Sequence, residues 1–235
     1  MTAASYPPAV LRAVAVLIVA VTAVGCGQHE SPAQKTAHAR ENQTRQAARK
    51  AGLSPAVQDL LALYATAATN KFAVTYAPST TGTTFVLIQD PPLRRVDVVA
   101  PPVTRSVFVT KQGTYECALE NQQWTCQQSQ QQEGAPGLLS AADLDTFIAD
   151  LNAARTNYTF SVTKKTVAGT DARCLVATPK QGVAGPSSTL CLSSRGAVLL
   201  SEGTSNPLRA VKYSTSVDDR RLQLPTAPEP PQPKP

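Results

Sequence analysis

Four of the five cysteines lie in segments where apolar and polar residues alternate, and they restrict how those segments can pair. In the stretch YECALENQQWTC, residues 115–126, a two-residue turn at positions 121 and 122 would place Cys117 opposite Cys126. Counting outward from that turn makes the pair non-hydrogen-bonded, a geometry in which α-carbons approach to about 4.5 Å and a disulfide fits. Similar counting applies across the loop PKQGVAGPS. We therefore predict two hairpin disulfides, Cys117 with Cys126 and Cys174 with Cys191.

A metal site or a redox pair is the rival explanation for these cysteines. The sequence has no CxxC spacing, and its two histidines, His29 and His38, lie far from the four cysteines. Zinc and thioredoxin-like sites normally need one of those features. We expect no metal and no cofactor, and an oxidising compartment, which an even set of paired cysteines favours.

The rest of the central region predicts two helices among many strands. One helix begins at Ser54 and Pro55, a cap followed by a favoured first position, and the other at Ser140, where Asp143 completes a capping box. Their apolar stripes are Val57, Leu60, Leu61 and Tyr64, and then Leu144, Phe147, Ile148 and Leu151. Segments with strand patterns are residues 72–76, 84–89, 94–99, 105–110, 158–167, 172–178, 188–194, 197–202 and 208–217.

The N-terminus predicts export and attachment to a membrane. Arg12 is followed by an apolar run from Ala13 to Val24 that is shorter than the roughly 20 residues of a membrane span. The run ends at Gly25 and Cys26, which looks like a bacterial lipobox, with signal peptide 1–25 and an acylated, for example palmitoylated, Cys26. The alternative is a plain signal peptide cleaved nearby, with Cys26 incidental. We expect the extracytoplasmic face of the cell membrane.

Both flanks of the central region are polar. Residues 26–53 lack apolar periodicity, so we predict a lipid-anchored tether that can become helical in its last part. The sequence ends in PTAPEPPQPKP, and residues 226–235 are expected to be a disordered proline-rich tail. The folded domain would then span residues 54–225.

Composition and motifs exclude several function classes. The net charge of +6 is spread over a chain with only 16% charged residues, and no block of like charge suggests a nucleic-acid partner. Both histidines lie in the tether, and the sequence has no GxSxG, P-loop, GxGxxG or HExxH motif. We therefore expect no catalytic residues and no enzyme activity.

The central segments carry a resemblance to a known family. FAVTY, TTFVLIQDPPLRRVDVV with its PP-x-R-R element, YECALENQQWTC, LCLSSRGAVLLSEG, AVKYSTSV and LQLP together resemble actinobacterial lipoproteins with a LolA-like fold. This resemblance implies an α+β domain, a strongly curved antiparallel half-barrel with about two helices packed on its concave side. It also implies that the protein carries or senses lipids or acylated ligands in the cell envelope.

Two functions follow, and they differ in whether an apolar cavity exists. A lipid carrier or sensor needs a pocket of roughly several hundred Å³ between sheet and helices. Its candidate wall residues are Phe72, Val74, Tyr76, Phe85, Leu87, Phe108 and Phe160. In the alternative, these residues form an ordinary core, and the protein is an anchored interaction or sensor module whose envelope protein partner the sequence does not identify.

Overall fold

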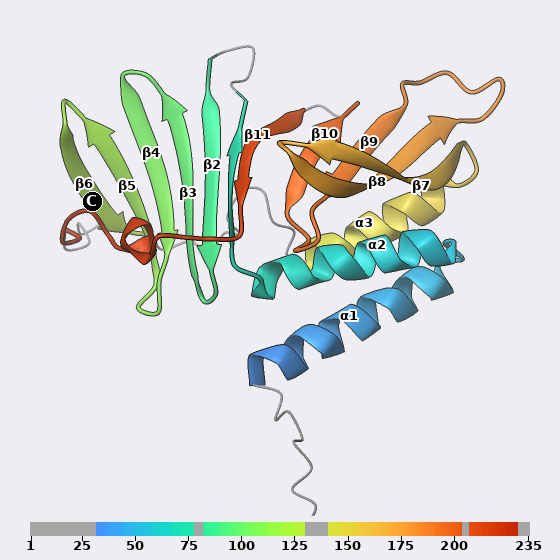
Figure 1. Cartoon of the computed structure of the whole chain (residues 1–235), viewed down its shortest axis with the longest axis horizontal. Helices are drawn as coiled ribbons and strands as arrows, with labels where there is room; N and C mark the ends of the chain where they lie inside the picture. The colour runs from blue at the N-terminus through green and yellow to red at the C-terminus, as the bar shows by residue number, and fades with distance from the viewer. Residues whose placement is uncertain (1–31, 78–81, 130–140, 204–206, 230–235) are drawn as a thin grey trace, which may run out of the picture. The chain divides into compact units, whose positions relative to one another are not determined.

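The computed structural model describes residues 32–77, 82–129, 141–203 and 207–229, and shows an α+β arrangement of one large antiparallel sheet and three α-helices (Figure 1). The helices are α1 (Pro32–Lys50), α2 (Pro55–Thr66) and α3 (Ala141–Ala154), with short 3-10 turns η1 (Ala67–Thr69) and η2 (Asp219–Leu222). The segment expected to be a signal peptide, residues 1–25, and the expected anchor Cys26 lie outside the described residues.

Eleven strands form the sheet, in the order β6-β5-β4-β3-β2-β1-β11-β10-β9-β8-β7. The strands are β1 (Phe72–Tyr76), β2 (Thr84–Asp90), β3 (Leu93–Ala100), β4 (Val103–Val109), β5 (Thr114–Glu120), β6 (Gln123–Gln128), β7 (Tyr158–Val167), β8 (Thr170–Pro179), β9 (Ser188–Leu192), β10 (Val198–Glu202) and β11 (Leu208–Ser214). The sheet is open, with β6 and β7 at its edges. Every strand segment expected from the sequence is present.

Both predicted disulfides are confirmed, together with the strand pairing behind them. Asn121 and Gln122 have φ values of 48° and 65°, as a two-residue hairpin turn requires. This turn sets the pairing of β5 with β6 and places Cys117 opposite Cys126. The second bond joins β8 to β9, with Cys174 opposite Cys191.

Helix α1 corrects the expectation of a tether over residues 32–53. It packs against α2 and buries Thr44 and Ala48. Leu53, which comes directly after the turn that follows α1, is also buried. The buried stripe is made of small or polar residues, so it has no apolar periodicity that the sequence could reveal. The folded domain therefore begins near residue 32, before the expected boundary at residue 54.

The main core lies between the helices and one face of the sheet, which we call the inner face. On β1 and β2 this face carries Phe72, Val74, Tyr76 and Leu87, all buried together with apolar residues of α2 and α3. In Figure 1 the three helices gather beside β1 and β7–β11, and strands β3–β6 extend beyond them.

The opposite, outer face of β2–β6 is covered by the chain's C-terminal end. Residues 215–229, which we call the strap, follow β11; η2 contacts β2 and β3, and Leu222 is buried. A second apolar cluster lies under the strap: Phe108, Tyr115, Cys117 and Cys126, with Trp124 and Leu224 packed against them.

The end of the strap corrects the expectation of a disordered tail for residues 226–229. The Glu229 N–H donates to the Cys126 carbonyl over 2.8 Å, and Glu229 forms a parallel bridge with Gln127 on edge strand β6. Proline lacks a backbone donor, but the glutamate between prolines keeps one, so it can pair with the strand.

Candidate functional site

The seven residues expected to line a cavity occupy three different environments. Four of them, Phe72, Val74, Tyr76 and Leu87, are deeply buried in the main core. Phe85 and Phe160 are half-buried at its margin. Phe108 lies under the strap on the outer face, so its assignment to a helix-side wall is wrong. None of the seven lines the pocket under α3 or the groove beside α1 that are described below.

Beyond the helices, the inner face of β2–β4 stays apolar but is only half-covered. Strand pairing places Phe85 of β2 beside Val98 of β3. On the same face, β4 contributes Val107, opposite Val96, and Val109, opposite Arg94. All four side chains are half-buried, and among the described residues the three valines belong to neither core cluster. We call Phe85, Val98, Val107 and Val109 the open strip.

Arg94 borders the open strip. It lies opposite Val109 on the inner face and is half-buried. Its Nε donates to Gln89 Oε1 over 3.1 Å, and this is its one hydrogen bond within the described parts of the chain. Burial lowers the pKa of the Arg94 guanidinium. The next residue, Arg95, points to the outer face.

A partly open, mainly apolar pocket of about 140 Å³ lies under α3. Phe147 and Leu151 of α3 form one wall, and β8–β10 form the other through residues such as Leu175 and Leu190. This volume is smaller than the several hundred Å³ expected from the sequence. The pocket shows that α3 does not fill the space above these strands.

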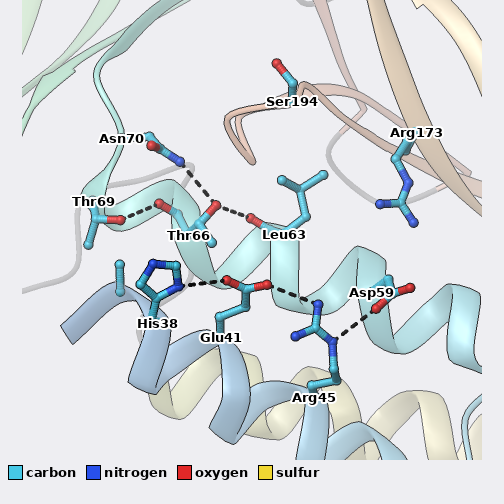
Figure 2. Close-up of a pocket in the computed structure, with 11 residues that line it drawn as sticks. His38, Glu41, Arg45, Asp59, Leu63, Thr66, Thr69, Asn70, Arg173 and Ser194 are labelled. Atoms are coloured by element: carbon cyan, nitrogen blue, oxygen red, sulfur yellow. Dashed lines mark hydrogen bonds and ion pairs between the residues drawn. The ribbon is translucent and has the colours of Figure 1, made fainter. Parts of the chain in front are cut away.

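A larger groove, of about 940 Å³, lies between α1, α2, η1 and the ends of β8 and β9 (Figure 2). Its lining is polar. Arg45 of α1 joins two carboxylates, with its Nη2 3.0 Å from Glu41 Oε1 and its Nε 3.0 Å from Asp59 Oδ1 of α2. Arg173 of β8 points into the groove from the sheet side, and among the described residues no ion pair to it is found.

Close packing of a turn against α2 shapes one end of this groove. Gly196 has a φ of 76°, and a Cβ there would collide with the Leu63 carbonyl. The β9–β10 turn can therefore approach α2 only with glycine at this position. Asn70 joins the two elements, because its Nδ2 donates to the Arg195 carbonyl over 3.1 Å.

The shifted pKa values of Tyr76 and Arg45 follow from structural contacts. Burial raises the pKa of Tyr76, whose hydroxyl donates to the Val198 carbonyl over 2.9 Å. Burial by itself would lower the pKa of Arg45. The hydrogen bonds to Asp59 and Glu41 outweigh this effect, so the pKa of Arg45 is raised. Across the described ranges, no cluster of three or more metal-ligating side chains occurs.

Helix length and polarity bear on membrane insertion. None of the helices in the described part of the chain is both long and apolar enough to cross a bilayer.

The sequence matches no protein-family model and no curated protein.

Several features of this site were not expected from the sequence. The polar groove depends on α1, whose helical packing has no apolar signal. Gln89 and Arg94 were noted only as part of a strand and of the PP-x-R-R element. The signal that could have drawn attention to Arg94 is strand parity, since residues 94, 96 and 98 share one face.

Proposed function

We propose that this protein is a membrane-anchored lipoprotein that binds the acyl chain of a lipid on the inner face of its sheet, for transport or sensing in the cell envelope. The observation that carries the proposal is the open strip. Apolar side chains on a sheet normally pack under another layer, and here a contiguous set extends past the helices. An acyl chain can cover such a strip, because it needs no polar partners.

The architecture supports this proposal. The resemblance to LolA-like lipoproteins implies a curved antiparallel half-barrel with helices on its concave side, and an open antiparallel sheet of eleven strands with helices over one face agrees with it. In addition, β7 contacts β11, although three strands separate them in the sheet order. A flat sheet would keep these strands apart, so the contact favours strong curvature on that side.

Anchoring through Cys26 would hold the domain close to the lipid surface. Helix α1 begins at Pro32, so six peptide units connect it to Cys26, and they can extend over at most about 20 Å. A diacylated cysteine supplies the two chains that stable attachment requires. We expect Cys26→Ser to release the protein from the membrane fraction. A mutant that still sediments with membranes after a high-salt wash would contradict the lipobox.

A matched pair of substitutions on β3 tests acyl-chain binding. Val98 and Val99 are adjacent and both half-buried, but Val98 lies in the open strip and Val99 on the outer face. In the full chain carrying Cys26→Ser, we expect Val98→Asn to weaken binding of a fluorescent fatty-acid analogue about tenfold, because apolar contact is lost. Val99→Asn should leave binding unchanged.

The binding assay needs circular dichroism beside it, so that lost folding is not taken for lost binding. Equal affinity in both variants, with both folded, would contradict the open strip as the binding surface. Absence of saturable binding to the parent chain would contradict lipid binding altogether.

The second function, an anchored interaction module without a lipid cavity, is favoured by one observation. The groove of about 940 Å³ between α1, α2 and η1 has charged groups that suit a polar partner rather than an acyl chain. The two functions separate in the same assay, because this alternative predicts no saturable binding of the fatty-acid analogue and no effect of Val98→Asn.

A further inference from the structure

Arg94 is a half-buried cation for which no counter-ion is found among the residues that the structure describes. Its single hydrogen bond within the described residues joins Nε to the neutral amide of Gln89, and its pKa is lowered by burial, with no carboxylate contributing. Partly buried charges in folded proteins are normally paired, because desolvation is costly unless an opposite charge offsets it. Here the described part of the chain supplies the cation without an opposite charge.

Gln89 holds the guanidinium in a defined orientation. Its side chain is 1% exposed, and its Nε2 donates to two carbonyls at the end of α2 and η1, those of Ala67 and Asn70. With both amide protons used in this way, Oε1 must face Arg94 and accept from its Nε. This arrangement leaves the two Nη groups of Arg94 without a hydrogen-bond partner among the described residues. Together they form an edge that can bind an oxyanion in a bidentate manner.

The surroundings of Arg94 suggest what carries the oxyanion. On the inner face, Val109 lies opposite Arg94, and the open strip continues from it through Val107 to Val98, whereas Val96 is buried in the main core. The strand rise from position 94 to position 98 is about 13 Å. A charged group with an extended apolar chain fits this pattern. An inorganic anion would use Arg94 but would leave the open strip uncovered.

We propose that Arg94 binds the oxyanion of an acyl ligand, a carboxylate or a phosphate, while the chain lies over the open strip. This inference rests on the proposed function and specifies the ligand class: an anionic amphiphile, in preference to a neutral lipid. Gln89 is a positioning residue, since it contacts Arg94 and not the ligand.

Competition binding with three amphiphiles tests the inference. In the full chain carrying Cys26→Ser, palmitic acid, lysophosphatidic acid and palmityl alcohol each displace a fluorescent fatty-acid analogue. We expect at least one anion to bind about tenfold or more tightly than the alcohol, and Arg94→Met to remove that preference without weakening the alcohol. The anion whose affinity falls identifies the head group as a carboxylate or a phosphate.

Two further variants make the test specific. Arg105→Met is the matched control, because Arg105 is an exposed arginine on the inner face of the neighbouring strand, and it should change no affinity. Arg94→Lys keeps the charge but loses the planar fork, so it should retain part of the preference. It also provides a second reading if Arg94→Met does not fold.

Each outcome separates this inference from the proposed function. If Arg94→Met leaves anion affinity unchanged, or if Arg105→Met removes the preference instead, the inference is overturned while acyl-chain binding stands. If palmityl alcohol binds the parent chain as tightly as both anions, Arg94 is not a head-group site. If none of the three amphiphiles binds, both the inference and the proposed function fail.

Discussion

Arg94 and Arg95 are neighbours in the chain, but they lie in two faces of the sheet with opposite character. On the outer face, Arg95 contacts a carboxylate, a carbonyl and an aromatic ring. Its Nε lies 2.6 Å from Asp97 Oδ1, its Nη1 donates to the Arg221 carbonyl over 3.1 Å, and its guanidinium stacks 4.9 Å from the Phe108 ring centroid. On the inner face, the one partner of Arg94 within the described ranges is the Gln89 amide.

The difference shows which face the chain closes for stability and which it leaves available. The strap supplies the Arg221 carbonyl and the side chains of Leu222 and Leu224 to the outer face. Asp97 also accepts a 2.7 Å hydrogen bond from the Ser106 hydroxyl. No such element covers the inner face of β3 and β4 among the described residues. The same two strands therefore serve as core on one side and as a candidate binding surface on the other.

The largest expected effect comes from exchanging each arginine for methionine. Arg95→Met leaves Asp97, which is 5% exposed, without its cation, and should lower the free energy of unfolding by about 3 kcal/mol. Arg94→Met breaks no ion pair and should change it by less than about 1 kcal/mol. Urea unfolding followed by Trp124 fluorescence measures both. Equal destabilisation by the two variants would contradict the contrast between the faces.

Removing each disulfide compares the cluster under the strap with the main core. The loop-entropy model predicts losses of about 2.5 kcal/mol for Cys117→Ala with Cys126→Ala and about 3 kcal/mol for Cys174→Ala with Cys191→Ala, from sequence separations of 9 and 17. Unfolding in urea should therefore give similar values for the two double variants. A loss for either one that is larger by several kcal/mol would show that packing, rather than loop closure, dominates there.

Two tyrosines of the inner face provide a smaller contrast. Tyr76→Phe removes the hydrogen bond to Val198 and should cost about 1 kcal/mol at neutral pH. Tyr213→Phe should cost nothing or stabilise, because the buried Tyr213 hydroxyl has no hydrogen-bond partner among the described residues. Thermal unfolding of both variants checks the order, and a larger loss for Tyr213→Phe would contradict it.

Tyr76 also gives the stability a pH dependence. Burial raises its pKa in the folded state, so its contribution is fully present below the unfolded pKa of about 10 and is lost as the pH rises above that value. Between pH 7 and pH 11, Tyr76→Phe should lose less stability than the parent chain. A parallel decline in the two proteins would contradict this assignment.

The smallest effect is expected where the strap ends at edge strand β6. Glu229→Pro removes the N–H that donates to Cys126 and should cost about 1 kcal/mol or less. Glu229→Ala keeps the donor and serves as the control. If both variants behave alike in urea unfolding, the strap is not held by this bond.

Local patterns explain why much of the fold was predictable. Alternation over five to ten residues defines a strand, and the two-residue turn at Asn121 and Gln122 sets a register that extends to the Cys117–Cys126 pair. The second disulfide follows in the same way. Each of these features depends on residues close together in the chain, so the sequence carries the information directly.

Long-range packing explains what the sequence did not reveal. Helix α1 is held by a stripe that includes Thr44 and Ala48, which become apolar contacts only when α2 lies against them. Similarly, Leu222 and Leu224 stand among polar residues, and nothing local marks Leu222 as buried or Leu224 as packed against the cluster of Phe108.

The sequence by itself determined the strand segments, the pairing of the two cysteine hairpins and both disulfides, because these follow from periodicity and turn chemistry. Only the tertiary structure decided which face of β2–β6 is closed. Strand parity places Arg94 and Arg95 on opposite faces, but it does not say which face the strap will cover. That choice depends on a segment more than 120 residues further along the chain, through the bond from Arg95 to Arg221.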